Sequence, residues 1–139
     1  MPFETRSEKR HPIQVTAEFC IHESMTSTVK LNAPVKCVKA PLLDISATGC
    51  ALDSPYLIPP DTLLKIDIDA TPFAAELKIE RPLPVVVTGN VRSCAMKAAG
   101  HYRLGIYFAE IKKEDAELIL NFIKAMERRQ SPRWDMSQG

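Results

Sequence analysis

Hydrophobic and polar residues alternate with a period of two over much of the chain. Apolar residues occupy the odd positions of the stretch 13–19, and the stretch 64–69 alternates in the same way. Such alternation is typical of a β-strand with one buried face. Together with shorter apolar and β-branched runs, the pattern predicts about six antiparallel strands, over residues 13–19, 35–45, 50–52, 64–68, 85–94 and 102–111.

Proline and glycine mark the breaks between these strands. The prolines of the stretch 55–60 predict a surface turn, because proline cannot donate a ladder hydrogen bond. Gly89, inside a β-branched run, predicts a bulge or bend. Residues 98–101 predict a turn. Residues 71–84 are ambiguous: Leu77 and Ile79 fit a strand, but the prolines at 82 and 84 limit its pairing.

One helix is predicted near the C-terminus. Apolar residues recur there at helical spacing and define one face: Ala116, Ile119, Leu120, Ile123 and Met126. Acidic residues precede this face and Arg128 and Arg129 follow it, which suits the helix macrodipole. Pro132 ends the helix. The predicted fold is therefore all-β dominated, a sheet that closes or folds on itself with a C-terminal helix over an open face or end.

Composition limits the class of protein. The 139 residues suit one domain, and 18 basic against 17 acidic side chains give a net charge of +1. A near-neutral total argues against DNA or RNA as the partner. Membrane insertion is not expected, because no apolar run approaches the roughly 20 residues a span needs. The N-terminus has no apolar leader segment, so we expect a cytoplasmic protein.

The cysteines and the known catalytic motifs give no sign of a metal site or an enzyme. The four cysteines are scattered without a C-x-x-C pair, so they are expected to be reduced thiols, and a metal site at Cys20 and His22 is disfavoured. No G-x-S-x-G, P-loop, H-E-x-x-H or Rossmann glycine motif is present. Asp67 and Asp69 share one side of a strand, which we interpret as a solvated face. No enzyme is predicted, and no cofactor or metal.

The stretch Asp44-Ile45-Ser46-Ala47-Thr48-Gly49 is the most informative segment. In extended chain, Asp44 and Ser46 project to the same side. Gly49 is expected to turn the backbone with a positive φ, so that both side chains face one small ligand. The same residue types also suit a turn capped by an Asp or Ser side chain between two strands. Both interpretations stay open on the residues alone.

This stretch resembles the D/N-x-S-x-x-G motif of PilZ domains, which are bacterial receptors for cyclic di-GMP. The segments Gly89–Arg92 and Tyr102–Phe108 resemble the family's G-x-V-x-R and Y-x-x-G-I-x-F strands. The resemblance runs from about residue 6 to residue 125. It implies a six-stranded antiparallel PilZ-like β-barrel with a C-terminal α-helix.

The resemblance also implies a ligand site. Arg6 and Arg10 satisfy the family's R-x-x-x-R motif, and they would clamp cyclic di-GMP while Asp44, Ser46 and Gly49 complete the pocket. Arginine suits this role, because its planar fork meets phosphate oxygens or guanine bidentately and stacks on bases. A second alignment places Lys9 and Ile13 at the two motif positions, and that version would bind poorly.

The sequence therefore predicts an N-terminal arm over residues 1–12, a barrel with its helix over 13–127 and a polar tail over 128–139. The expected function is a non-catalytic cyclic di-GMP receptor. Ligand binding would order the arm, and the chain would signal to an unidentified partner protein with a motility, exopolysaccharide or virulence output. The alternative is an adaptor with the same fold that binds no cyclic di-GMP. One or two ligand molecules, and a monomer or homodimer, are all compatible.

Overall fold

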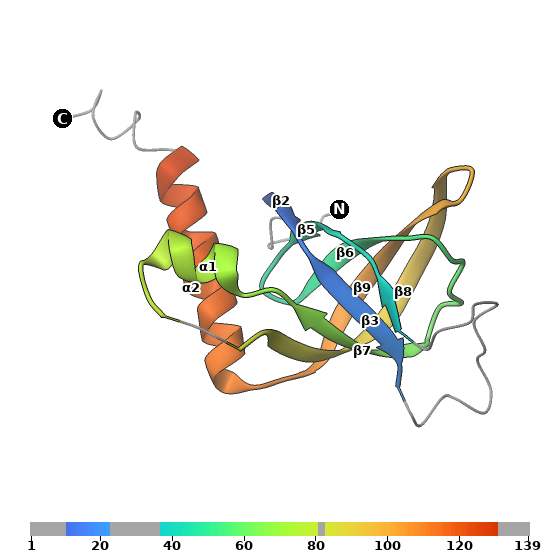
Figure 1. The fold of residues 1–139 in the computed structure, drawn as a ribbon, viewed down its shortest axis with the longest axis horizontal. Helices are drawn as coiled ribbons and strands as arrows, with labels where there is room; N and C mark the ends of the chain where they lie inside the picture. Colours follow the sequence, from blue (N-terminus) through green and yellow to red (C-terminus); the bar gives the residue numbers. More distant parts are fainter. Residues whose placement is uncertain (1–10, 23–36, 81–82, 131–139) are drawn as a thin grey trace, which may run out of the picture.

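A computed structural model describes residues 11–22, 37–80 and 83–130 of the chain. This part consists of one curled antiparallel sheet and two helices, with α1 and α2 side by side (Figure 1). The strands are β2 (His11–Val15), β3 (Ala17–Ile21), β4 (Cys37–Lys39), β5 (Leu42–Ile45), β6 (Gly49–Ser54), β7 (Leu63–Ile68), β8 (Val85–Ala98) and β9 (His101–Ile111), and the helices are α1 (Thr71–Leu77) and α2 (Lys113–Gln130).

The sheet follows the order β2-β5-β6-β9-β8-β7-β3-β4 and returns on itself. β2 and β3 are two halves of one segment interrupted at Thr16, and β4 and β5 are two halves of another, interrupted at Ala40 and Pro41. β2 pairs with β5, whereas β3 pairs with both β4 and β7. The six predicted strands are therefore present as eight, because two of them bend and are counted twice. The predicted fold class is confirmed.

The core fills the inside of this curled sheet. Alternate residues of each strand point inward, as the period of two predicts. On β9, Leu104, Ile106 and Phe108 are buried, while Arg103 before them and Tyr107 among them are exposed. Burying one such apolar side chain contributes roughly 1.5–3 kcal/mol. The same alternation defines an outer face of the sheet, on which the candidate site lies.

Two predicted breaks are confirmed. The β8–β9 ladder shifts register between Thr88 and Gly89. A Cβ at Gly89 would lie 2.5 Å from Ile106 Cγ2, so only glycine fits this inward position. At the tip of the same hairpin, Gly100 has a φ of 78°, which makes the predicted turn at 98–101 a left-handed one.

Helix α1 was not predicted. It lies within the ambiguous stretch 71–84, where the structure shows a helix instead of a strand. Asp69 Oδ1 accepts a hydrogen bond from Thr71 N at 3.0 Å, and Pro72 occupies the first turn, where its missing N–H costs nothing. Lys78 ends the helix in the left-handed region with a φ of 58°. The alternation of Leu77 and Ile79 is therefore a consequence of the helix end and not of a strand.

Helix α2 is present, but its predicted apolar face is partly wrong. Ile119 and Ile123 are buried as expected, whereas Leu120 is 40% exposed and Leu118 and Phe122 are buried instead. The reason is that α1 packs beside α2 and covers part of its surface. The buried face of α2 is therefore shifted toward α1 and away from Leu120. The Phe73 and Phe122 rings meet edge to face with centroids 4.8 Å apart.

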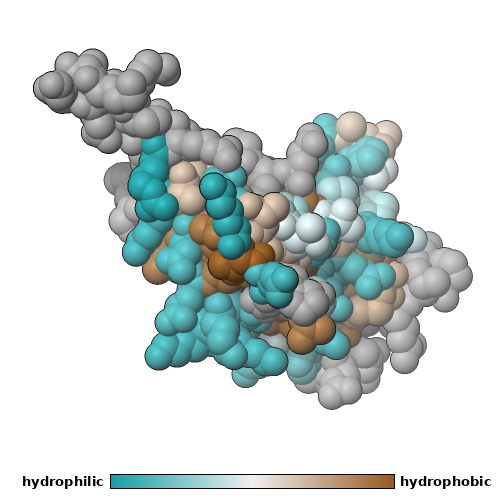
Figure 2. All heavy atoms as spheres, turned by 60° about the vertical axis from the view of Figure 1, so that its left-hand side comes forward, coloured by the Kyte–Doolittle hydropathy of each residue, from teal (hydrophilic) through white to brown (hydrophobic). Residues whose placement is uncertain are grey.

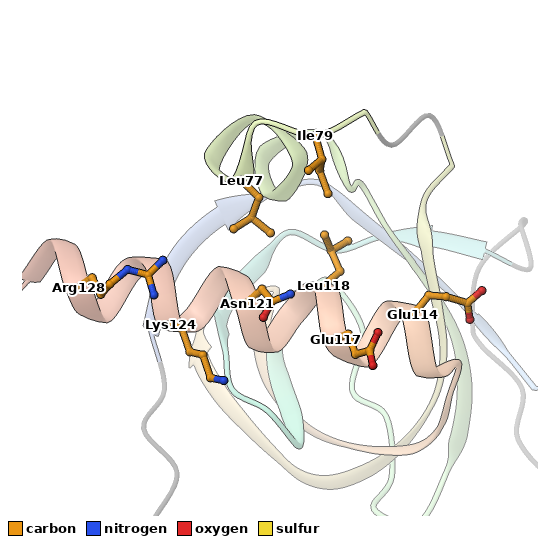
Figure 3. Close-up of a pocket in the computed structure, with 8 residues that line it drawn as sticks. All are labelled: Leu77, Ile79, Glu114, Glu117, Leu118, Asn121, Lys124 and Arg128. Carbon is orange, nitrogen blue, oxygen red and sulfur yellow. The ribbon is translucent and has the colours of Figure 1, made fainter.

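A groove of about 460 Å³ lies between the two helices. Leu77 at the end of α1 and Ile79, two residues past that end, line the groove on one side, and Leu118 of α2 lines it on the other (Figure 3). On this side of the molecule, apolar residues form a patch between hydrophilic ones (Figure 2).

Neither helix of the described residues is both long and apolar enough to cross a membrane.

The expectation of reduced cysteines is wrong for two of the four. Cys20 and Cys37 form a disulfide between β3 and β4, where they are directly opposite each other with Cα atoms 4.2 Å apart. The sequence did not indicate this pair, because a separation of 17 positions gives no spacing signal. Cys50 is buried and Cys94 is half-buried, and neither takes part in this disulfide.

Candidate ligand-binding site

The segment from Asp44 to Gly49 forms the connection between β5 and β6. Ser46 N donates to Gly49 O at 2.8 Å, and the Ser46 hydroxyl donates to the same carbonyl at 3.3 Å. Thr48 N donates to Ser46 Oγ at 3.3 Å. Ser46 is only 2% exposed. The serine-capped turn, one of the two interpretations open on the residues, is therefore present in the structure.

Gly49 serves this connection in a way that differs from the prediction. Among the described residues, positive φ values occur at Asp61, Lys78 and Gly100, and Gly49 does not share them. Its backbone instead pairs with Tyr107 on β9, and a Cβ there would lie 2.1 Å from the Ile106 carbonyl oxygen. Glycine is required because β6 and β9 approach too closely for any side chain, and not because the turn needs a left-handed residue.

Asp44 is held by an arginine from a distant part of the chain. Arg103 Nη2 on β9 donates a hydrogen bond to Asp44 Oδ2. The Asp44 side chain is 12% exposed and the Arg103 side chain 44% exposed. One carboxylate oxygen is therefore engaged by a cation that itself reaches solvent at the outer face of the sheet.

Small residues lie between Asp44 on β5 and Arg103 on β9 on the outer face of the sheet. Asp44 is opposite Ala51 on β6, and Ala51 is opposite Gly105 on β9. Gly105 is opposite Ser93 on β8, and its missing Cβ leaves room for the Ser93 hydroxyl, which would lie 2.5 Å from such an atom. Ala51, Gly105 and Ser93 form a row of small residues on the outer face, here called the floor. The Asp44 and Arg103 side chains project beside it.

A second arginine lies at the other end of this floor. The Arg92 guanidinium stacks over the Tyr107 ring, with its Cζ 4.7 Å from the ring centroid. Arg92 lies where the β8–β9 register shifts between Val91 and Ser93, and Tyr107 is opposite Gly49. Tyr107 is 45% exposed. The outer face thus carries two arginines and an exposed aromatic ring around the Asp44–Gly49 segment.

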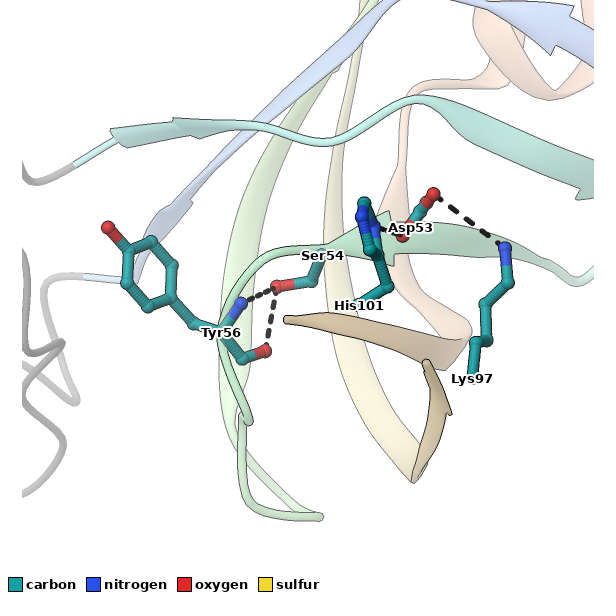
Figure 4. A network of polar contacts seen from close by, with 5 residues as sticks. All are labelled: Asp53, Ser54, Tyr56, Lys97 and His101. Carbon is teal, nitrogen blue, oxygen red and sulfur yellow. Dashed lines mark hydrogen bonds and ion pairs between the residues drawn. The ribbon is translucent and has the colours of Figure 1, made fainter. Parts of the chain in front are cut away.

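An acidic residue borders the site toward the hairpin tip. Asp53, opposite Arg103 on β6, lies 3.3 Å from His101 Nδ1 and 3.7 Å from Lys97 Nζ (Figure 4). Next to it, the buried Ser54 hydroxyl donates to Tyr56 O at 2.7 Å and accepts from Tyr56 N at 2.9 Å. These contacts fasten the end of β6 to the following loop.

Arg6 and Arg10, with the rest of residues 1–10, lie outside the described residues, as does most of the predicted tail. β2 itself begins at His11, and it enters the sheet beside the site, since His11 is opposite Ile45 and Pro12 is opposite Asp44.

The two aspartates near the end of β7 do not share a strand face. Asp67 lies on β7, whereas Asp69 lies beyond its end and accepts a hydrogen bond from Thr71 N at the start of α1. Cys20 is bonded to Cys37, so its thiolate is not available to a metal. Within the described part of the chain, no three His, Cys, Asp or Glu side chains converge on a metal position.

The family model of the PilZ domain matches residues 4–125 of this chain. With the curled sheet and the C-terminal helix in place, the chain belongs to the PilZ domain family, as its motifs suggested. A comparison with curated protein sequences gives no match.

Solved structures agree with this fold. The Bacillus subtilis inhibitor of motility MotI/DgrA has a TM-score of 0.64 at 16% identity, over 94% of this chain and 54% of MotI. MrkH of K. pneumonia, solved as a complex with cyclic di-GMP, has a TM-score of 0.64 at 14% identity, over 94% and 56%. The PilZ domain of YcgR from Escherichia coli with cyclic di-GMP has a TM-score of 0.60 at 11% identity, over 95% and 98%. This chain spans about half the length of MotI and MrkH.

Proposed function

We propose that this chain is a non-catalytic receptor for cyclic di-GMP, which binds on the outer face of the sheet at the Asp44–Gly49 segment. Membership of the PilZ family supports the proposal. So do the two similar structures, of MrkH and of the YcgR PilZ domain, that were solved with this dinucleotide. The observation that carries it is the outer-face cluster, in which Asp44 lies beside Arg103 and across the floor from Arg92 and Tyr107.

The chemistry of this cluster matches the ligand. Cyclic di-GMP carries two guanines and two phosphodiester charges. Asp44 accepts hydrogen bonds from the N–H donors of a guanine edge, and Arg103 offsets the repulsion that this carboxylate alone would exert on the phosphates. The flat Arg92–Tyr107 pair offers a face for base stacking. Gly105 and Ser93, the part of the floor that the Asp44–Arg103 pair does not cross, leave space for a planar base beside the backbone.

The part of the predicted N-terminal arm that precedes β2, residues 1–10, supplies the other half of the proposed site. Arg10 is covalently attached to His11, whose backbone is opposite Ile45, one residue from Asp44. Arg10 precedes this strand residue directly in the sequence and Arg6 lies four positions earlier, which supports a role for both at this edge of the cluster. We propose that both arginines clamp the ligand, and that fixing the arm on the sheet creates the surface read by a partner protein.

An adaptor that binds no ligand is the second candidate, and one observation favours it. Ser46 is buried and hydrogen-bonded to Gly49 and Thr48, and Asp44 is bonded to Arg103. The motif side chains therefore have structural roles that would keep them in place without cyclic di-GMP.

The two candidates are separated by titrating the full chain and two variants with cyclic di-GMP. Receptor function predicts that Arg10→Ala weakens binding by about 1.5 kcal/mol or more, the range for a charge-assisted contact. Lys65→Ala is the matched control, because Lys65 is an exposed cation on β7, which is not a neighbour of β5 or β6. Equal affinities of Arg10→Ala and Lys65→Ala would remove the arm from the site. Absence of binding by the unmodified chain would favour the adaptor.

A further inference from the structure

The solvent-exposed side of α2 carries an ordered row of charges. The row consists of Glu114, Glu117, Asn121, Lys124 and Arg128, all of them exposed. The spacing alternates between three and four residues, so these side chains form one stripe along the helix. Acidic residues occupy its N-terminal half and basic residues its C-terminal half (Figure 3).

This stripe is complementary to itself in the reverse direction. Glu117 and Lys124 are placed symmetrically about the Leu120–Asn121 step, and Glu114 and Arg128, each seven positions from Asn121, are symmetric about a point half a residue further along. In an antiparallel pair of such helices, related by a two-fold axis at this step, each glutamate would face a basic residue of the other copy. Such an isologous interface forms every pair twice.

Apolar side chains flank the centre of the stripe. Leu120 is 40% exposed on α2, and Ile79 is 49% exposed where the chain leaves α1. Ile79 lines the groove together with Leu77 and Leu118 (Figure 3). A two-fold axis at the Leu120–Asn121 step would bring Leu120 against its own copy on one side, and would close the grooves of both copies against each other on the opposite side.

We propose that the α1–α2 face binds a second copy of this chain through antiparallel pairing of the two α2 helices. The macrodipole of a single helix also favours acidic residues first and basic residues last. It does not account for an apolar residue at the centre of the exposed face or for a partly open apolar groove beside it. The proposal uses no residue of the ligand site, so it holds or fails independently of cyclic di-GMP binding.

Charge reversal tests the pairing directly. Sedimentation equilibrium of the full chain should show a concentration-dependent dimer that dissociates more readily at high salt, because exposed ion pairs are screened. Glu117→Lys and Lys124→Glu should each weaken dimerisation at least about tenfold, since each converts two attractive pairs into repulsive ones. Glu18→Lys is the control, an exposed acid on β3, a strand that pairs with β4 and β7, and it should leave dimerisation unchanged.

Restoration is the decisive part. The double variant Glu117→Lys/Lys124→Glu should dimerise within about threefold of the unmodified chain, because the pairs are re-formed with their signs exchanged. An equal mixture of the two single variants should form a heterodimer for the same reason. If these charges served only the helix macrodipole, the double variant would instead have the least stable α2 of the set and would not recover dimerisation.

Circular dichroism of each variant at low concentration controls for folding. The proposal is overturned if the unmodified chain stays monomeric up to its solubility limit, whether because the groove takes a segment of another protein or because it takes nothing. It is also overturned if single variants dimerise normally, or if neither the double variant nor the mixture restores the dimer.

Discussion

Arg103 on β9 reaches across β6 to donate a hydrogen bond to Asp44 on β5, although the two residues are 59 positions apart. The intervening position on β6 is Ala51, whose methyl group leaves the path open. Because the pair lies at the outer face, the aspartate of the family motif is positioned by a cation that solvent and a ligand can both reach.

Removing this arginine should affect ligand binding more than folding. We expect Arg103→Ala to weaken cyclic di-GMP binding about tenfold, because the Asp44 carboxylate is then left to repel the phosphates and loses its fixed orientation. The unfolding free energy should fall by about 1 kcal/mol or less, since Arg103 is half-exposed and its ion pair is screened. Calorimetric titration and chemical denaturation measure the two effects. A large loss of stability with unchanged affinity would make the pair a purely structural one.

Gly49 should tolerate no side chain. In Gly49→Ala the new Cβ would lie 2.1 Å from the Ile106 carbonyl oxygen, a backbone atom that moves only with β9. We expect a loss of about 3 kcal/mol or more in unfolding free energy, at the upper end of the range for overpacking. Gly100→Ala is the matched control: nothing lies within 4 Å of its Cβ, and its φ of 78° alone should cost about 1 kcal/mol. The reverse order of the two losses would contradict this account of Gly49.

The disulfide should make stability depend on reducing agent. Cys20 and Cys37 close a loop with a sequence separation of 17, for which chain entropy predicts about 3 kcal/mol. The double variant Cys20→Ala/Cys37→Ala should lose about that much, and dithiothreitol should bring the unmodified chain to a similar value without affecting the variant further. Thiol titration of the denatured, unreduced chain should find only Cys50 and Cys94. Four reactive thiols would show that the bond does not form.

Packing between the helices should be a major source of stability. Phe73 of α1 is fully buried and its ring meets Phe122 of α2 at 4.8 Å. Phe73→Ala should cost about 3–5 kcal/mol, the usual range for a buried phenylalanine. Leu83→Ala is the control, since Leu83 is 68% exposed and should change stability by less than about 0.5 kcal/mol. Similar unfolding curves for both variants would show that α1 does not anchor α2.

Period-two patterns predicted most of the fold because a half-buried strand records its two faces in consecutive residues. The stretches 13–19 and 64–68 are strands for this reason, and Gly89 was recognised as a bend from its position in a β-branched run. Helix α1 was not predicted because it has only seven residues, with a proline in its first turn. Leu120 was misplaced because the buried side of α2 depends on where α1 packs, and α1 itself was not predicted.

Only those residues of the candidate site that lie in one continuous segment could be predicted from the sequence. Asp44, Ser46 and Gly49 stand together in the sequence, whereas the partners Arg103, Arg92 and Tyr107 join them through strand register. Arg103 and Tyr107 lie on the outer face of β9, and the pairing of β6 with β9 places Gly105, which stands between them, opposite Ala51, the β6 partner of Asp44. The role of Gly49 likewise depends on Ile106, more than 50 residues away, and the disulfide depends on the register of β3 with β4.

The receptor proposal is tested most directly by calorimetric titration of the full chain with cyclic di-GMP, with GTP as the control ligand. GTP shares the guanine and carries more phosphate charge, so selectivity over it requires the geometry of the cyclic dinucleotide. The proposal predicts saturable binding in the micromolar range or tighter, corresponding to about −8 kcal/mol or better, and little heat with GTP. Absence of heat with cyclic di-GMP, together with an unchanged melting temperature in its presence, would contradict the receptor function and leave the adaptor.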